Sequence, residues 1–150
     1  MNETKREVER RRLIEETLDE SYGECLLKRQ EIARIVESAL FYFNGERYFL
    51  HSWVVMPNHV HVLVTPMGIN IMSAIVHSWK SFTAKEANRL LGRKGVFWQE
   101  EYFDRVIRNE THFRAVVEYI EYNPVRAGLC ALITDWKFGS FLGARASRPL

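Results

Sequence analysis

The sequence predicts one small domain that mixes α-helices with an antiparallel β-hairpin. Residues 31–43 and 72–91 repeat apolar side chains at helical spacing on one face. Between them, residues 46–55 and 59–66 are rich in aromatic and β-branched residues, and the short Pro57-Asn58 turn that separates them favours an antiparallel pair. A chain of 150 residues, 47% of them hydrophobic, is long enough for one core and too short for two comfortable ones.

The boundaries of the first two helices follow from their end signals. Asn44-Gly45 stops the first, and the second is expected to end near Gly92, because glycine and asparagine are common just past a helix. Residues 102–107 are expected to form a short strand. Asn109 is a suitable cap for a third helix, which we expect to end near Tyr122 because the next residue precedes a proline and is pushed out of the α region.

The two ends of the chain differ from this pattern. Residues 1–30 mix both signs of charge with few apolar residues, and we expect a charged helical leader, docked weakly or not at all. Residues 31–142 are expected to form the domain. Residues 143–150 are expected to be a mobile basic tail.

Composition excludes several classes of protein. Cys25 and Cys130 lie far apart without a CxxC partner, so we expect reduced thiols rather than a thiolate metal site or a redox motif. No apolar run reaches the ~18 residues of a membrane span, and the charged start lacks the apolar core of a signal peptide. We therefore expect a cytoplasmic protein. The net charge of +2 permits nucleic-acid binding without requiring it.

The most informative stretch is the second strand of the hairpin. His59 and His61 are two residues apart, so in a strand both imidazoles project from the same face. Two imidazoles on one strand can hold a divalent cation if a third ligand is available. A structural pair on a half-exposed face would have the same spacing.

The third helix can supply the missing ligand. Tyr119 and Asn123 are four residues apart and share a helical face. We expect Asn123 to lie at the frayed end of the helix, where its amide oxygen is free to turn toward a cation. Such mixed nitrogen and oxygen ligation suits Mg²⁺ or Mn²⁺. A tyrosine beside a metal that polarises a phosphate can attack phosphorus and expel a 3′ hydroxyl. Tyr122 is the rival nucleophile, one turn further along.

A modest local excess of positive charge lies between the second and third helices. Residues 80–114 carry eight Lys or Arg against five Asp or Glu. A solvated helix surface would explain most of this charge. The functional alternative is a basic track with Trp98, Tyr102 and Phe103 available to stack on unpaired bases. The residues that we expect to contact DNA on this second interpretation are Lys80, Lys85 and Trp98.

Four motifs together resemble the REP-associated tyrosine transposases, which are single-tyrosine HUH enzymes related to insertion-sequence-200 type transposases. They are WVVMPNHVHVLV, KSFTAKEAN, FWQEEYFDRVIRN and YIEYNPVRAGL, in that order along the chain. The resemblance implies an α/β (α+β) fold with a small antiparallel ferredoxin-like sheet and helices on its faces. It also implies cleavage and transfer of single-stranded or hairpin DNA through a 5′-phosphotyrosine.

The resemblance assigns roles to residues of this chain. His59 and His61 correspond to the metal-binding histidines, Asn123 lies where the family has its third ligand, and Tyr119 corresponds to the nucleophile. The third motif contains Arg105 and Arg108, which resemble phosphate contacts; a salt bridge to Asp104 or Glu110 is the alternative. A monomer and a homodimer are both compatible with the family.

The chain departs from the family at its start. Members of the family usually begin with an aromatic, Thr-rich strand beside the histidine strand, and this chain shows a charged segment there. We therefore expect the first strand to be missing, or poorly replaced by residues 24–28, with an unpaired edge on the histidine strand. A second function is also open, that of a non-catalytic DNA hairpin-binding protein descended from such an enzyme.

Overall fold

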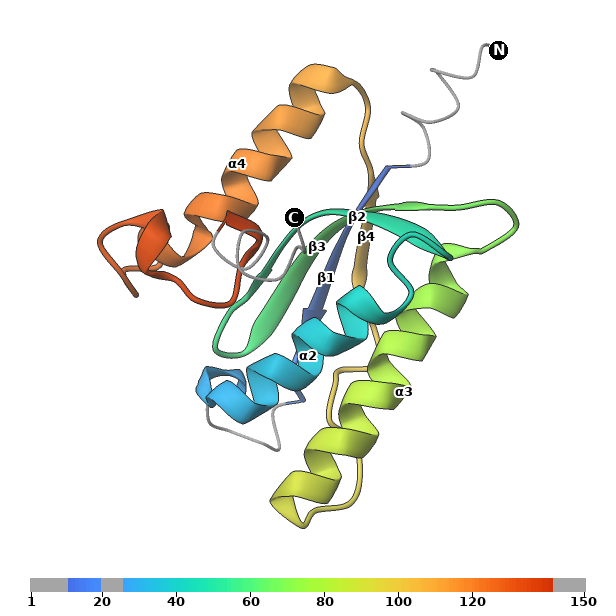
Figure 1. Ribbon diagram of the computed structural model, residues 1–150, viewed down its shortest axis with the longest axis vertical. Coiled ribbons are helices and arrows are strands. Elements are labelled where there is room, and N and C mark those ends of the chain that lie inside the picture. Colours follow the sequence, from blue (N-terminus) through green and yellow to red (C-terminus); the bar gives the residue numbers. More distant parts are fainter. Residues whose placement is uncertain (1–10, 20–25, 142–150) are drawn as a thin grey trace.

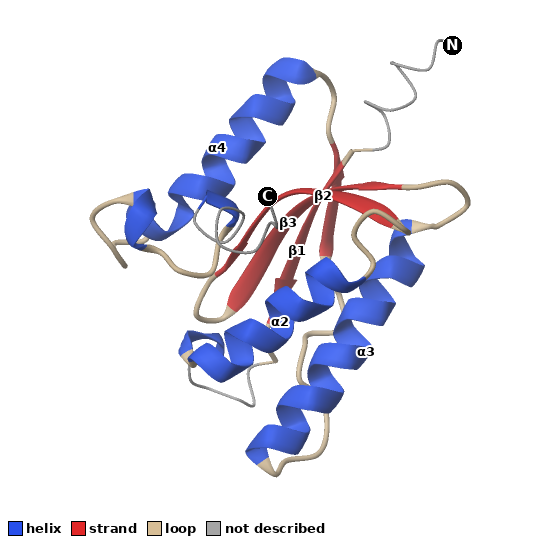
Figure 2. Ribbon diagram, viewed as in Figure 1, coloured by secondary structure: helices blue, strands red, loops and turns tan. Residues whose placement is uncertain are grey.

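A four-stranded antiparallel sheet forms the centre of the computed structural model, which describes residues 11–19 and 26–141 (Figure 1). The strands lie in the order β2-β3-β1-β4. Helices α2 and α3 cover one face of the sheet and α4 lies on the other (Figure 2). The elements are β1 (Arg12–Thr17), the 3-10 turn η2 (Leu26–Lys28), α2 (Gln30–Tyr42), β2 (Tyr48–Val55), β3 (His59–Pro66), α3 (Met72–Leu91), β4 (Phe103–Val106), α4 (Glu110–Arg126) and the 3-10 turn η3 (Ile133–Asp135).

The chain order β1-α2-β2-β3-α3-β4 with this strand order is the ferredoxin-like arrangement. The expected fold class is therefore confirmed. Helix α4 follows the last strand and adds a third layer on the opposite face of the sheet. Among the described residues no helix is long and apolar enough to cross a membrane.

The hairpin and the helices form where their local sequence predicts them. Strands β2 and β3 pair antiparallel around the Pro57-Asn58 turn. Gly92 ends α3 with a left-handed φ of 65°, a conformation that glycine adopts without a Cβ clash. The Asn109 side chain caps α4 by accepting a hydrogen bond of 2.8 Å from the backbone N–H of His112.

The expectation that the first strand is missing is wrong. Residues 12–17, whose charges predict part of a helical leader, form β1, a central strand that pairs with β3 on one side and β4 on the other. The histidine strand therefore has partners on both sides. Leu26–Lys28, considered as a substitute strand, form a 3-10 turn instead. Residues 1–10 and 20–25 of the expected leader lie outside the described residues.

Sequence patterns do not identify β1 as a strand because it contains three charged residues. Leu13 and Ile14 are buried on its two faces, at 5% and 0% exposure. Its charged side chains lie near opposite charges or histidine that come from distant parts of the chain. Arg12 pairs with Asp104, Glu15 lies beside His61, and Glu16 faces Lys80.

The expected end of the third helix is also wrong. Helix α4 continues through Pro124 to Arg126, so Asn123 lies within the helix rather than at a frayed end. Proline removes one backbone donor, but Pro124 is buried and the following N–H groups still bond to the helix. The N–H of Ala127 donates to the carbonyl of Asn123 at 3.0 Å. The expected tail, residues 143–150, lies outside the described residues.

Candidate metal and nucleophile site

The two faces of β3 serve different purposes. Val60, Val62 and Val64 point into the core beneath α2 and α3. The opposite face carries His59 and His61, which is the alternation that a strand imposes.

A row of four side chains crosses the sheet at His61. Strand pairing places Val54, His61, Glu15 and Phe103 side by side on β2, β3, β1 and β4. Directly paired residues of antiparallel strands project to the same face. In the part of the chain that the structure describes, helix α4 packs mainly on β2, with fewer contacts to β3, which leaves the β1–β4 half of this face more open. The histidines therefore lie at the boundary between a covered and an open half of the face.

His59 is held by the residue before it. Its Nδ1 lies 2.7 Å from Oδ1 of Asn58. Burial, together with the neighbouring His61, lowers the pKa of His59 to about 4, although Glu15 opposes the shift. The imidazole is therefore neutral near pH 7, as a metal ligand must be.

His61 is almost completely buried, at 3% exposure. Its ring lies edge-on to that of His59, with 4.7 Å between the centroids. Nδ1 of His61 is 3.1 Å from Oε1 of Glu15. This distance is short enough for a hydrogen bond, but the two groups are not aligned for one, and neither ring nitrogen has another partner among the described residues. The contact with His61 lowers the pKa of Glu15 despite its partial burial.

Tyr119 reaches this face from α4. Its ring centroid lies 5.4 Å from that of His61, with the planes at 81°. The side chain is 38% exposed, so it contacts the histidine while remaining accessible. Tyr122 is exposed as well, but it makes no ring contact with either histidine within residues 11–19 and 26–141.

A second cationic group accompanies the tyrosine. The guanidinium carbon of Arg126 lies 5.7 Å from the centre of the Tyr119 ring, and its Nη1 is 3.5 Å from the Tyr119 carbonyl. Arg126 is exposed. Its charge is therefore available to an anion that approaches the tyrosine.

The donor set fits a divalent cation of intermediate hardness. Buried imidazole nitrogens without a protein partner are costly unless they bind something. No three His, Cys, Asp or Glu side chains converge on one point in the described part of the chain, so a third protein ligand has to be of another type. Asn123, half-buried and one turn beyond Tyr119, offers an amide oxygen.

The family of the chain follows from comparison with known proteins. The family model described as "Transposase IS200 like" matches residues 8–123, from before β1 to the end of the YIEYN segment. The chain belongs to the IS200-like transposase family. The match begins ahead of β1, which agrees with a complete sheet.

Two proteins are similar to this chain in sequence. The REP-associated tyrosine transposase of Escherichia coli K12 is 31% identical over 110 residues, which are 72% of this chain and 64% of the relative. A protein of Haemophilus influenzae is 27% identical over 97 residues, 58% of this chain and 55% of its own length. The chain thus matches less than two thirds of either relative.

A solved structure of a REP-associated tyrosine transposase bound to a REP hairpin has the same fold. Its TM-score is 0.72 at 25% identity, and the alignment covers 94% of this chain and 83% of that one. Because the alignment covers 94% of this chain, the similarity to the solved structure extends over the sheet and the helices α2, α3 and α4.

The residues expected to contact DNA do not all reach the histidine face. Trp98 is 5% exposed and donates to Thr83 Oγ1 at 2.7 Å, so its ring packs in the core in this structure and is not accessible to a base. Lys80 donates to the backbone carbonyls of Gln99 and Glu100, at 2.7 and 2.9 Å, and therefore holds a loop.

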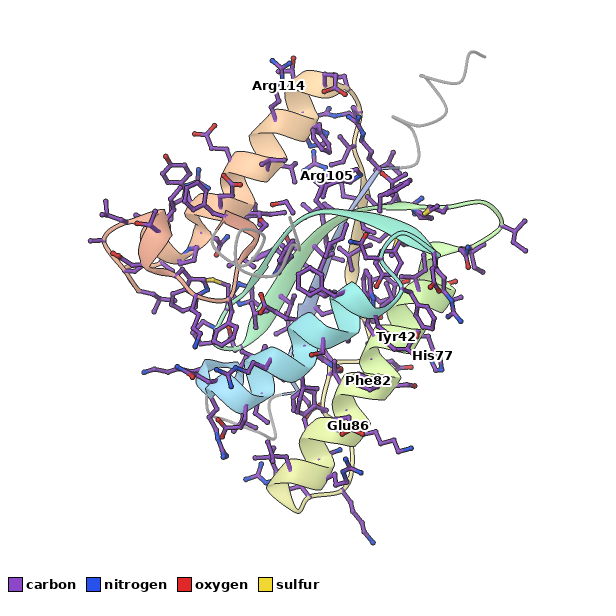
Figure 3. All side chains as sticks on the ribbon, in the orientation of Figure 1. Tyr42, His77, Phe82, Glu86, Arg105 and Arg114 are labelled. Carbon is purple, nitrogen blue, oxygen red and sulfur yellow. The ribbon has the colours of Figure 1, made fainter. Side chains whose placement is uncertain are left out.

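The other three basic residues remain exposed. Lys85 lies on α3, across the sheet from the histidines. Arg105 and Arg108 lie at the β4–α4 end, and Figure 3 shows Arg105 near the start of α4. The acids proposed as their salt-bridge partners are paired elsewhere, Asp104 with Arg12 and Glu110 with Arg11.

Sequence patterns missed several residues at this face. Asn58 and Glu15 contact the two histidines, and Arg126 lies beside the nucleophile candidate. Phe103 was not missed, because it is one of the aromatic residues expected to stack on bases; it ends the row on β4 with 49% exposure. Asn58 and Arg126 stand inside the motifs quoted above, which was a usable signal. Glu15 could have been predicted only if β1 had been recognised as a strand, and the charged residues of β1 prevented this.

Proposed function

We propose that this IS200-like transposase cleaves and rejoins single-stranded DNA through a covalent bond to Tyr119, with Mg²⁺ or Mn²⁺ as the cofactor. The observation that carries the proposal is the 5.4 Å between the ring centroids of Tyr119 and His61 within one chain. That distance supports a site formed in cis, whether the protein is a monomer or a homodimer.

The phenolate oxygen of Tyr119 is the attacking group. It forms a bond to phosphorus while the bond from phosphorus to the 3′ oxygen breaks in line with it. The tyrosine proton leaves to solvent, and the departing 3′ oxygen takes one up. The product is a 5′-phosphotyrosine, and a later 3′ hydroxyl can reverse the step and join two strands without a further energy source.

His59, His61 and Asn123 are the residues that would hold the cation. When bound, a divalent cation polarises a phosphate oxygen and neutralises charge that builds up at phosphorus. The low pKa of His59, about 4, keeps one imidazole neutral at physiological pH. Arg126 adds a positive charge beside the tyrosine, where an approaching phosphate is attracted.

The open half of the histidine face suits a single strand. Phe103 is half-exposed in the same row as His61 and can stack on an unpaired base. Arg105 lies two residues further along β4, on the same face as Phe103, and Arg108 follows the strand, so both can neutralise phosphates. The similar solved structure is bound to a REP hairpin, which supports hairpin DNA as the substrate of this chain.

The test is formation of a covalent adduct. Labelled hairpin DNA with a single-stranded extension is incubated with Mn²⁺ and the protein, and the products are run on a denaturing gel. We expect a shifted band with the wild type and Tyr122→Phe, and none with Tyr119→Phe, His59→Ala or excess chelator. An adduct that persists in Tyr119→Phe contradicts the assignment of the nucleophile.

The second candidate is a hairpin-binding protein without catalysis. The face with Phe103 and Arg105 serves either function. Tight binding of the hairpin with no adduct at any Mn²⁺ or Mg²⁺ concentration would favour this candidate. Unchanged binding and cleavage in the presence of chelator would instead assign both histidines a purely structural role.

A further inference from the structure

Both histidines turn the same ring atom toward the protein. Nδ1 of His59 lies 2.7 Å from an amide oxygen of Asn58, and Nδ1 of His61 lies 3.1 Å from a carboxylate oxygen of Glu15. The two partners come from different places, the hairpin turn and the neighbouring strand β1. The same orientation is therefore produced twice by independent parts of the fold.

The chemistry of these partners restricts the protonation of the rings. An ionised carboxylate and the oxygen of an amide accept hydrogen bonds and cannot donate them. An imidazole nitrogen that faces such an oxygen has to carry the proton. A neutral ring has one N–H, so its other nitrogen, Nε2, keeps a free lone pair.

Glu15 is better suited to this task than to binding a metal itself. It stands directly opposite His61 in the strand register, so its distance from the ring is set by backbone hydrogen bonds. Glu15 and the two histidines do not converge on a common point among the described residues. The side chain of Glu15 is 30% exposed, which leaves the carboxylate free to turn into alignment with the ring.

A solely structural ion pair is the alternative reading of the contact. It would explain the closeness of Glu15 to His61 but not the parallel contact of Asn58 with His59, since Asn58 carries no charge. It would also leave Nε2 of His61 buried without a partner among residues 11–19 and 26–141. A ring held by Nδ1 so that Nε2 can bind a cation accounts for all three observations.

We propose that Glu15 and Asn58 are positioning residues that fix His61 and His59 as Nδ1–H tautomers, so that both present Nε2 to a divalent cation. This inference deepens the proposed function and rests on it for the identity of the bound group. It also gives β1 a functional role besides completing the sheet.

The first measurement is the tautomer of each histidine in the metal-free full-length chain, by long-range ¹⁵N–¹H correlation NMR at pH 7.5. We expect both rings to be protonated at Nδ1 in the wild type. Glu15→Ala should produce a mixture of tautomers at His61 and leave His59 unchanged, and Asn58→Ala should do the reverse. A wild-type ring protonated at Nε2 overturns the proposal for that histidine.

The second measurement is the affinity for Mn²⁺ alone, from the free-ion signal in electron paramagnetic resonance. We expect binding to weaken about 10- to 100-fold in Glu15→Ala and in Asn58→Ala, the range usual for partners of metal-binding histidines. Glu15→Gln keeps an acceptor oxygen and should recover part of the loss. Glu16→Gln is the matched control on the same strand, where it faces the opposite side of the sheet, and should bind Mn²⁺ like the wild type.

The two measurements separate this inference from the proposed function. Nδ1–H tautomers with normal Mn²⁺ binding in Glu15→Ala and Asn58→Ala would overturn the positioning role while leaving the metal site in place. If the wild type has Nδ1–H tautomers but does not bind Mn²⁺, the proposed metal dependence is overturned. The inference that Asn58 and Glu15 orient the histidines for a cation would then fall with it. Equal weakening in Glu16→Gln would contradict the proposal, because it would show a general effect of altering β1.

Discussion

Glu16 is a buried carboxylate whose removal should change how stability depends on pH. It is 6% exposed, and neither of its oxygens has a hydrogen-bond partner among residues 11–19 and 26–141. Burial raises its pKa to about 7, although Lys80, with Nζ 3.8 Å from the carboxylate, opposes the shift. The perturbation that we propose is Glu16→Gln, which removes the titration and nearly preserves the size of the side chain.

The sign follows from proton uptake. Between pH 4.5 and about 7 the folded protein keeps the proton on Glu16, whereas the unfolded chain has lost it. The free energy of unfolding therefore falls as pH rises through this range. The shift from 4.5 to about 7 corresponds to an upper bound of about 3.4 kcal/mol. Residual solvation of the site reduces our expectation to about 1–2 kcal/mol.

The assay is urea denaturation of the wild type and Glu16→Gln at pH 5, 6, 7 and 8. All other titrating groups are shared, so they cancel in the difference between the two proteins. We expect the stability of the variant relative to the wild type to increase by about 1–2 kcal/mol between pH 5 and pH 8. A difference that stays constant with pH, or that changes in the opposite direction, refutes this account of Glu16.

Two further predictions concern the central strand and the DNA surface. Ile14→Ala should lower the free energy of unfolding by about 2–5 kcal/mol, because the side chain is 0% exposed in the middle of the sheet; a loss below about 1 kcal/mol in urea titration would argue against a central β1. Phe103→Ala should weaken binding of single-stranded DNA by about 1–3 kcal/mol in fluorescence anisotropy. Phe82→Ala, which removes a similarly exposed ring from α3 (Figure 3), should leave that affinity unchanged, and equal losses would refute a role specific to Phe103.

Local sequence was sufficient wherever one pattern dominated. The β2–β3 hairpin follows from two β-rich runs around Pro57-Asn58, and the helices α2 and α3 from apolar side chains at helical spacing. His59 and His61 share a face because a strand alternates its side chains. These features depend on neighbours in the chain, which a sequence displays directly.

Strand β1 could not be recognised in the same way, since its charged residues are neutralised by distant partners. Arg12 contacts Asp104, and Glu16 faces Lys80, so the charges that indicate a solvated helix are accommodated by tertiary contacts. Only the assembled sheet shows that Leu13 and Ile14 are buried on opposite faces.

The aromatic loop before β4 shows the same limitation. Trp98 and Phe103 are equally plausible stacking residues in sequence, but Trp98 is 5% exposed and Phe103 is 49% exposed. Pairing with β1 decides which ring reaches the histidine face. At Pro124 a local rule predicted the end of a helix, whereas burial and the remaining hydrogen bonds extend α4 by four residues beyond Tyr122.

The most direct test of the central claim is to locate the covalent bond to DNA by mass spectrometry. Cleavage after Arg114 and Arg126 releases residues 115–126, a peptide that contains both Tyr119 and Tyr122. After the DNA is trimmed with a nuclease, fragment ions that break the chain between the two tyrosines assign the nucleotide to one of them. We predict that the nucleotide is on Tyr119. A nucleotide on Tyr122, or an unmodified peptide from a reaction that has cleaved its DNA, would contradict the proposal.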